Sequence, residues 1–162
     1  MPNQIMTTKT VEITPANDAE LLENARMTVF TPAQIAFMWS KIQPLLSTSA
    51  DVSPDISVEE LHAGLLNGMF QAVVITRNNE QGATDICGVL VYKIVKQKQN
   101  KVMFMLATAG EYITRINYFD ALKEIMKSRE INKLQCWARP SAARLWNRLG
   151  IKTLYSVMEI DV

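Results

Sequence analysis

The chain has few side chains of the kinds that carry catalysis, and none of them stands beside an obvious partner. The single histidine, His62, lies in a stretch of helical periodicity without an acid or nucleophile at a spacing that would make it a general base. Cys87 and Cys136 fall in apolar runs that predict strands, where a small buried side chain is the default role. A nucleophilic Cys136 would need a nearby cation, and Lys133 and Arg139 are close in sequence. We expect a solvent-facing or loosely packed histidine, two structural thiols and no metal site.

Three arginines form a second candidate site. Arg144 and Arg148 are four residues apart on one face of a predicted helix, and Arg139 lies just upstream, with no acid nearby in sequence. Such a strip is either a solvated helix face or a docking surface for an acidic partner or a nucleotide phosphate. Arg139, Arg144 and Arg148 are therefore candidate partner-binding residues.

Composition and charge exclude several classes of protein. The 162 residues predict one domain, and 48% hydrophobic residues indicate a folded chain. Lys and Arg number 17 against 16 Asp and Glu, so the net charge of +1 favours neither specific nucleic-acid binding nor an anionic membrane surface. No apolar run reaches the ~18–20 residues that span a bilayer, and the polar first nine residues lack a secretory signal. We expect an intracellular protein with both thiols reduced.

The N-terminal segment of residues 1–30 is predicted to contain a first strand at 10–14, a helix-prone stretch at 18–25 and a second strand at 27–30. The clearest helices follow this segment, and each begins with a capping box. Thr31 and Gln34 begin the first helix, and Ser57 and Glu60 begin the second, which stops near residue 67. Pro44 predicts a bend or break in the last turn of the first helix. The first helix carries an apolar stripe of Ile35, Met38, Trp39, Ile42, Leu45 and Leu46.

The remainder, within a domain of residues 31–162, alternates strands and helices. Three apolar runs at 70–76, 86–95 and 102–107 are joined by short polar turns and predict an antiparallel meander. A helix at 114–130 then leads to a strand at 133–138, which implies a parallel crossover. Another helix starts at Pro140, with an apolar stripe of Ala142, Leu145, Trp146 and Leu149, and a final strand is predicted at 153–160. The fold class is a mixed α/β sheet with helices on both faces.

This order resembles the GCN5-related N-acetyltransferase (GNAT) superfamily from about Thr31 onward. The best local match is residues 138–151, where Leu149 and Gly150 stand as in the "Leu-Gly-Phe" that ends a short helix of the family. The segment from Trp39 to Leu46 and the position of Arg139 look most like the small GNAT-like proteins of tailed bacteriophages. That resemblance implies residence in a host cell or incorporation in a virion, with particle or host proteins as partners.

The resemblance also implies where acetyl-CoA would bind. The family cradles the pyrophosphate with a (Gln/Arg)-x-x-Gly-x-(Gly/Ala) turn that opens a helix, where N–H groups and the helix dipole meet the phosphates. Here the matching stretch, residues 108–117, has one glycine, the bulky Tyr112 and Ile113, and an acid at Glu111 that would repel phosphate. A backbone N–H at the end of the preceding strand would polarise the thioester carbonyl. The candidate cofactor-binding residues are Leu106, Ala107, Thr108, Gly110 and Arg115.

The catalytic acid that the family supplies has no counterpart in this sequence. Many members use a Tyr on the last helix, and Trp146 occupies that position here, whose indole N–H does not titrate in water. Tyr112 and Tyr155 are substitutes by residue type alone, and the central strands offer no general base, only Asp85 at an edge. Two functions therefore remain open. We favour a phage-encoded accessory or virion protein that has kept the fold and lost the chemistry over an acetyl-CoA-dependent N-acetyltransferase with an atypical cofactor loop.

Overall fold

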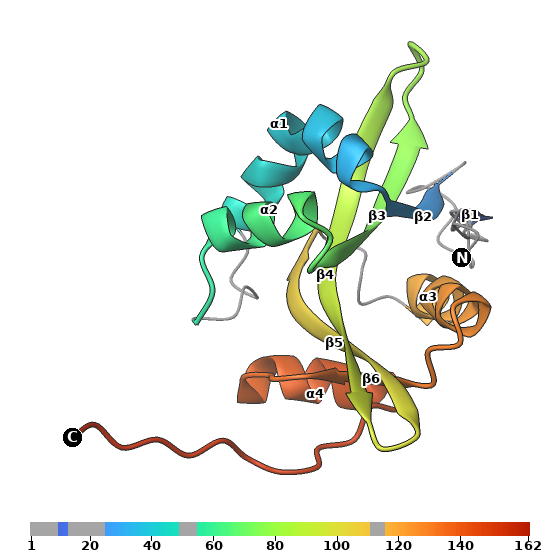
Figure 1. Ribbon diagram of the computed structural model, residues 1–162. Coiled ribbons are helices and arrows are strands. Elements are labelled where there is room, and N and C mark those ends of the chain that lie inside the picture. Colours follow the sequence, from blue (N-terminus) through green and yellow to red (C-terminus); the bar gives the residue numbers. More distant parts are fainter. Residues whose placement is uncertain (1–9, 13–24, 49–54, 111–115) are drawn as a thin grey trace, which may run out of the picture.

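A six-stranded sheet in the order β1-β2-β3-β4-β5-β6 forms the centre of the molecule, and helices lie on both of its faces (Figure 1). The structure, a computed structural model, describes residues 10–12, 25–48, 55–110 and 116–162. All but the last residue of the predicted helix at 18–25 lie outside these residues. The elements are β1 (Thr10–Glu12), β2 (Arg26–Phe30), α1 (Pro32–Thr48), α2 (Val58–Leu66), β3 (Gln71–Asn78), β4 (Thr84–Gln97), β5 (Asn100–Ala109), α3 (Ile116–Ser128), β6 (Lys133–Cys136) and α4 (Pro140–Arg148).

Both predicted capping boxes form. The Thr31 N–H donates to Gln34 Oε1 at 2.8 Å, and the Gln34 N–H donates to Thr31 Oγ1 at 3.2 Å. Ser57 and Glu60 make the same reciprocal pair at 2.8 and 3.1 Å. Of the bend or break expected at Pro44, the break does not occur: α1 continues to Thr48. The buried side chains on both sides of the proline, Ile42 and Leu46, hold the helix on the sheet and outweigh its missing N–H.

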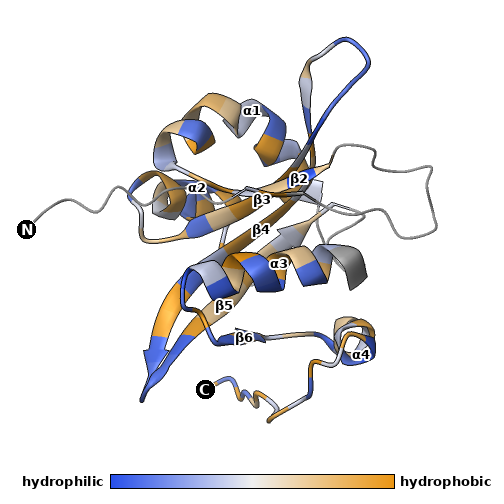
Figure 2. Ribbon diagram, turned by 90° about the vertical axis from the view of Figure 1, so that its right-hand side faces the viewer, coloured by the Kyte–Doolittle hydropathy of each residue, from blue (hydrophilic) through white to orange (hydrophobic). Residues whose placement is uncertain are grey.

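The sheet separates two apolar cores. On one face, side chains of β3 and β4 pack under α1 and α2; on the other, their sequence neighbours pack under α3 and α4. The prediction that the middle strand is covered on both faces is confirmed, because Val89 and Val91 point to the first core and Leu90 and Tyr92 to the second. Figure 2 shows apolar strands at the centre of the sheet and hydrophilic hairpin tips at its ends. Strands β1 to β5 pair antiparallel and β5 pairs parallel with β6. The predicted meander of β3, β4 and β5 and the predicted parallel crossover are thus confirmed.

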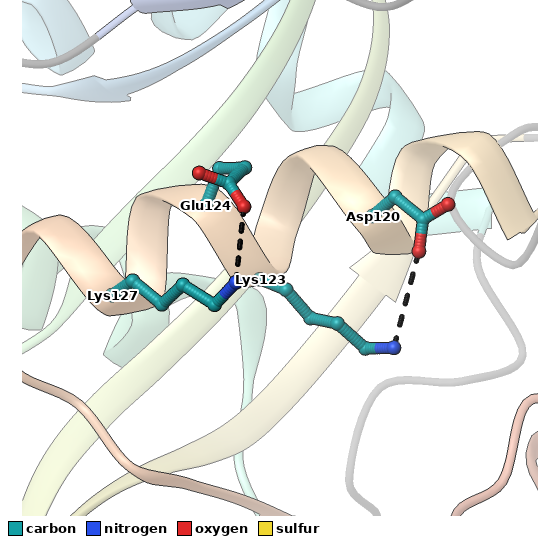
Figure 3. A network of polar contacts seen from close by, with 4 residues as sticks. All are labelled: Asp120, Lys123, Glu124 and Lys127. Carbon is teal, nitrogen blue, oxygen red and sulfur yellow. Dashed lines mark hydrogen bonds and ion pairs between the residues drawn. The ribbon is translucent and has the colours of Figure 1, made fainter.

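The outer face of α3 carries charged pairs one turn apart (Figure 3). Lys123 Nζ lies 3.9 Å from Asp120 Oδ1, and Lys127 Nζ lies 3.2 Å from Glu124 Oε1. All four side chains are at least half exposed, so each pair contributes at most about 0.2–1 kcal/mol to stability. This is a solvated helix face.

Among the described residues, no helix combines the length and apolar character that a bilayer span requires.

The prediction of a final strand at 153–160 is wrong for the isolated chain. Residues 152–162 follow α4 without forming a helix or strand, and all of them are exposed. A strand is stabilised by hydrogen bonds to a neighbour, and no other described strand of the chain lies alongside this segment. The composition of the segment favours a strand, but the described chain provides no neighbouring strand for its backbone hydrogen bonds.

Candidate functional site

A β-bulge in β5 lies where the sequence predicted the thioester-binding backbone. Val91 of β4 pairs with Ala107, but its neighbour Tyr92 pairs with Met105, so Leu106 is the extra residue that has no partner on β4. The bulge changes which face successive residues occupy: Met103 and Met105 pack under α3 and α4, whereas Ala107 and Ala109 pack under α1 and α2. Three of the predicted residues, Leu106, Ala107 and Thr108, therefore lie together at a backbone irregularity.

The neighbouring strand ends at the same level. Strand β6 pairs only with Val102–Met105 of β5, and its last residue, Cys136, is the partner of Met105. The sheet therefore opens between β5 and β6 at Leu106. A bulge beside such an opening turns main-chain groups away from the regular ladder, which is the arrangement required to polarise a carbonyl that enters from the side of β6.

Gly110 follows the bulged strand and approaches β4 through its backbone. The register between β3 and β4 also shifts, pairing Ile75 with Gly88 and Thr76 with Ile86, so that Cys87 is the extra residue of a second bulge. Gly110 has φ +100°, and a Cβ there would overlap the Cys87 carbonyl oxygen and come within 2.7 Å of Gly88 Cα. Glycine is therefore required by both conformation and space. Arg115 and the rest of the cofactor-loop prediction, residues 111–115, lie outside the described residues.

No described acid or base stands in this site. Thr108 is a buried polar side chain at the bulge, and no described carboxylate is buried. Burial raises the pKa of Cys87, although Arg77 opposes this shift, and burial also raises the pKa of Cys136. Both thiols are thus protonated at neutral pH and are poor nucleophiles. Within the described chain, no cluster of His, Cys, Asp or Glu could hold a metal ion.

His62 is packed more firmly than its sequence position predicted. Its ring stacks on Trp39 of α1, with centroids 3.8 Å apart and an angle of 4° between the planes. The histidine is half-buried rather than solvent-facing, because α2 packs against α1 and brings the two flat rings together. Its role is to join the two helices.

Trp146 is a core residue, as its helical spacing predicted. It is 7% exposed and its ring lies 6.5 Å from that of Phe119 in α3. Ala142 and Leu149 are partly buried against the same core, but Leu145 is 39% exposed, so the predicted four-residue stripe is too wide. Helix α4 lies at the edge of the sheet, where only a narrow face of the helix meets the core.

The three candidate arginines are all exposed, but only two of them share a surface feature. Arg144 and Arg148, with Ser141 and Leu145, line a hollow of about 320 Å³ on α4. Arg139 lies at the N-cap of α4 and does not line the hollow. Within the described chain, no carboxylate lies within ion-pair distance of any of the three. The hollow thus presents two cations whose charges no described acid balances.

One buried polar group escaped the sequence analysis. Tyr92, next to the bulge in the register, is fully buried and its hydroxyl donates to Gln71 Oε1 at 2.8 Å. Arg129 Nη1, at the end of α3, donates to the same oxygen at 3.4 Å. Burial raises the pKa of Tyr92 to about 12, and Arg129 partly opposes the shift. The sequence signal that could have identified this residue is a tyrosine directly after the apolar Val89–Val91. Its phenol stays protonated at neutral pH and cannot act as a base.

The comparisons with known proteins support the fold. No protein-family model matches the chain, and no curated protein matches its sequence. Among solved structures, a ribosomal-protein-alanine N-acetyltransferase from Brucella melitensis biovar Abortus 2308 is similar with a TM-score of 0.59 at 13% identity, covering 85% of this chain and 99% of the other. A possible acetyltransferase from Clostridium difficile 630 gives 0.58 at 14% identity, covering 86% and 99%.

A third similar structure contains the cofactor. It is a predicted acetyltransferase from Clostridium acetobutylicum solved with acetyl-CoA, with a TM-score of 0.54 at 14% identity, covering 85% of this chain and 96% of that one. The chain therefore has the α/β fold of the GNAT acetyltransferases.

Proposed function

We propose that this chain is a GNAT-fold protein without acetyl-transfer activity, which acts by binding other proteins. The observation that carries the proposal is Trp146, an indole buried in the core at the position where the family places its acid. Two described candidates have other roles: His62 is stacked on Trp39, and the Tyr92 hydroxyl donates a hydrogen bond to Gln71. Tyr155, a substitute by residue type, is exposed in the segment after α4. Activity depends on such side chains, and a fold can be retained when they are replaced.

The setting that we propose is a bacteriophage particle or its assembly in the host cell, as the sequence resemblance implies. For the contact surface we propose Arg144 and Arg148, which line the hollow on α4, together with the exposed Arg139 before it. Arginine pairs bind carboxylates in a fixed, two-pronged geometry, so the partner would be an acidic protein surface. Charge reversal of Arg144 and Arg148 to Glu should abolish co-sedimentation with purified particles, whereas reversal of Lys127 on the solvated face of α3 should not.

A second function, acetyl-CoA-dependent N-acetyl transfer, is favoured by one observation, the bulge at Leu106 beside the opening of the sheet. The backbone at Leu106, Ala107 and Thr108 would hold the acyl end of the cofactor, and Gly110 begins the loop that would hold its phosphates. Acetyl-CoA would supply the activated acyl group, and this chain would supply the amide hydrogen that polarises it. Proton removal from the acceptor amine has no assigned residue in the described chain.

Acetyl-CoA binding separates the two functions. A ligand at 100 times its Kd adds about 2.7 kcal/mol of stability, which for a chain of this size raises Tm by roughly 5–11 °C. We expect no saturable heat of binding and no rise in Tm up to millimolar acetyl-CoA. Coenzyme A without the acetyl group is the matched control ligand. Saturable binding of acetyl-CoA would show that the cofactor site is intact and would favour the second function.

Restoring the missing acid tests the chemistry directly. We expect Trp146→Tyr to show no transfer from acetyl-CoA to a panel of amines and peptides, because the acid is only one of the elements that the sequence lacks. Trp146→Phe is the control, since it removes the indole without adding an acid. Thiol release by Trp146→Tyr above the Trp146→Phe background would show that the cofactor loop was misjudged and that the backbone site still binds acetyl-CoA.

A further inference from the structure

One face of the sheet is uncovered where β4, β5 and β6 extend past α1 and α2. The core beneath these helices ends at Val91 on β4 and at Leu106 on β5, and no described residue of β6 belongs to it. Beyond this point the hairpin of β4 and β5 projects past both helices and ends in a hydrophilic tip (Figure 2). The opposite face of β6 is covered, because Leu134 and Cys136 pack against the core under α3 and α4. These strands therefore present one open face.

Two aromatic side chains lie on this open face. Phe104 alternates with Met103 and Met105, which pack in the covered core, so its ring lies on the other side of the sheet. Trp137 directly follows β6, and its ring meets that of Phe104 with centroids 5.6 Å apart and an angle of 85° between the planes. This contact holds the indole in place, and yet Trp137 is 59% exposed. A fixed and accessible indole is a platform on which another flat ring can stack.

Lysines surround the two rings. Lys93 is the partner of Phe104 on β4, and its Nζ lies 5.5 Å from the centroid of the Phe104 ring. Lys133 alternates with Leu134 of the covered core and so shares the open face, and Lys98 lies in the turn at the tip of the hairpin. All three lysines are exposed. Within the described chain, no carboxylate lies within ion-pair distance of any of them.

Acids are scarce in this part of the sheet. Strands β5 and β6 contain no Asp or Glu, and the one acid of β4, Asp85, lies at the opposite end of that strand. Glu130, in the turn before β6, is the acid nearest to Lys133 in sequence, and among the described residues the two form no ion pair. The whole chain has a net charge of only +1, but this face is locally cationic. Its charge complements that of an anionic partner.

We propose that this face binds single-stranded nucleic acid, with a base stacked on Trp137 and phosphates held by Lys93, Lys98 and Lys133. The bases of a single strand expose flat aromatic faces, and every base can stack on an aromatic side chain. Lysine binds phosphate as a point charge, whereas the planar geometry of carboxylates favours forked arginines. An aromatic platform among lysines therefore favours a nucleic acid over an acidic protein surface.

We expect this binding to tolerate many base sequences, because amide side chains near the rings are already paired with one another. The Gln97 amide donates to Gln135 Oε1 at 2.9 Å, and the Gln135 amide donates to Gln97 Oε1 at 3.2 Å. Asn132 Nδ2 donates to Asn100 Oδ1 at 3.0 Å in the same way. Base identity is read by hydrogen bonds to base edges, and these amides already have partners.

Fluorescence anisotropy with a labelled oligothymidine strand of about 15 nucleotides tests the proposal. We expect saturable binding at low salt, and three phosphate contacts predict a slope of about −2 for the logarithm of the binding constant against that of the salt concentration. Trp137→Ala should weaken binding at least about 5-fold, and Trp137→Phe, which keeps a ring, should restore most of the loss. Phe37→Ala, which removes an exposed ring from α1, is the control and should bind as wild type does.

Two further readouts separate contact from a structural role. Lys93→Gln and Lys133→Gln should each make the salt slope shallower by about 0.7, whereas Lys127→Gln, on the outer face of α3, should not change it. The strand should quench the indole fluorescence of the wild-type chain, because a stacked base lies against Trp137. Trp137→Phe should still bind the strand but lose this quenching.

Polyglutamate, which has charge without bases, and duplex DNA, whose bases are stacked on one another, are the competing ligands. Each should bind at least about 5-fold more weakly than the single strand. Polyglutamate binding as tight as that of the strand would assign the face to an acidic protein and overturn the proposal. No saturable binding of the strand, or wild-type affinity in a folded Trp137→Ala, would also overturn it. These tests alter neither Arg144 nor Arg148 and need no acetyl-CoA, so their failure leaves the proposed function untouched.

Discussion

Replacing Gly110 by Ala tests whether the backbone at the end of β5 is as tightly held as the structure shows. The substitution adds one methyl group where φ is +100°. That methyl would overlap the Cys87 carbonyl oxygen and lie 2.7 Å from Gly88 Cα, both of which are backbone atoms of a buried strand. No side-chain rotation can relieve the overlap, so either β4 or the end of β5 must move.

Two costs add to each other. A left-handed backbone conformation costs an alanine about 1–2 kcal/mol. Forcing an extra methyl group into a packed interior typically costs a further 1–3 kcal/mol. The total is about 2–5 kcal/mol, and because each kcal/mol changes Tm by about 2–4 °C in a chain of this size, Tm should fall by roughly 4–20 °C.

Urea denaturation followed by circular dichroism measures this loss, and Gly150→Ala is the matched control. Gly150 has φ +87°, but no atom lies within 4 Å of a Cβ built there, so only the conformational cost applies. The lower entropy of the unfolded alanine chain enters both variants and cancels in the comparison. We expect Gly110→Ala to lose at least 1 kcal/mol more than Gly150→Ala. Equal losses would refute the close approach of Gly110 to Cys87, and with it the geometry of the candidate site.

Two further substitutions test the buried polar network and a helix start. Burial raises the pKa of Tyr92 from 10.0 to about 12, so the folded chain holds this proton more tightly than the unfolded chain does. The bound proton therefore contributes to the free energy of unfolding in full below pH 10, and this contribution is lost as pH rises through 12. Tyr92→Phe should therefore show a smaller loss of unfolding free energy between pH 8 and pH 11.5 than wild type, whereas Tyr155→Phe, at an exposed site, should behave as wild type; an unchanged slope in Tyr92→Phe would contradict the assignment. Ser57→Ala removes the side-chain cap of α2 and should cost about 1 kcal/mol in urea melts. Ser141→Ala, which removes no side-chain bond found in the described chain, should cost less than half as much, and equal costs would deny the capping role.

Local patterns predicted the helices because each start signal acts within one turn. The Thr31 and Ser57 boxes satisfy the first N–H groups of α1 and α2 whatever the rest of the chain does. A break at Pro44, one of the two outcomes expected there, does not occur because the cost of the proline is local, whereas the burial of Ile42 and Leu46 that opposes a break depends on the sheet beneath. The strand expected at 153–160 failed for a related reason, since composition favours a strand but hydrogen-bond partners must come from elsewhere.

The candidate site was harder to predict because it depends on register. Alternation of side chains identifies a bulge only when the two faces differ in polarity, and residues 102–109 of β5 are apolar at nearly every position. The extra residue, Leu106, therefore left no mark on the pattern. The interaction of Tyr92 with Gln71 and Arg129 could not be predicted from local patterns, because it joins three elements that are far apart in sequence.

Packing of the two cores requires the bulge whether or not the chain binds a thioester. Met105 and Ala107 fill opposite cores, and shifting β5 by one residue to remove the bulge would move one of them out of its core and expose the gap. Packing alone is therefore enough to retain the bulge in a chain that no longer binds a thioester. An acid on α4 has no such protection, because a buried Trp146 packs beside Phe119 without any need to titrate. The bulge is thus compatible with both proposed functions, and side chains, not the bulge, decide between them.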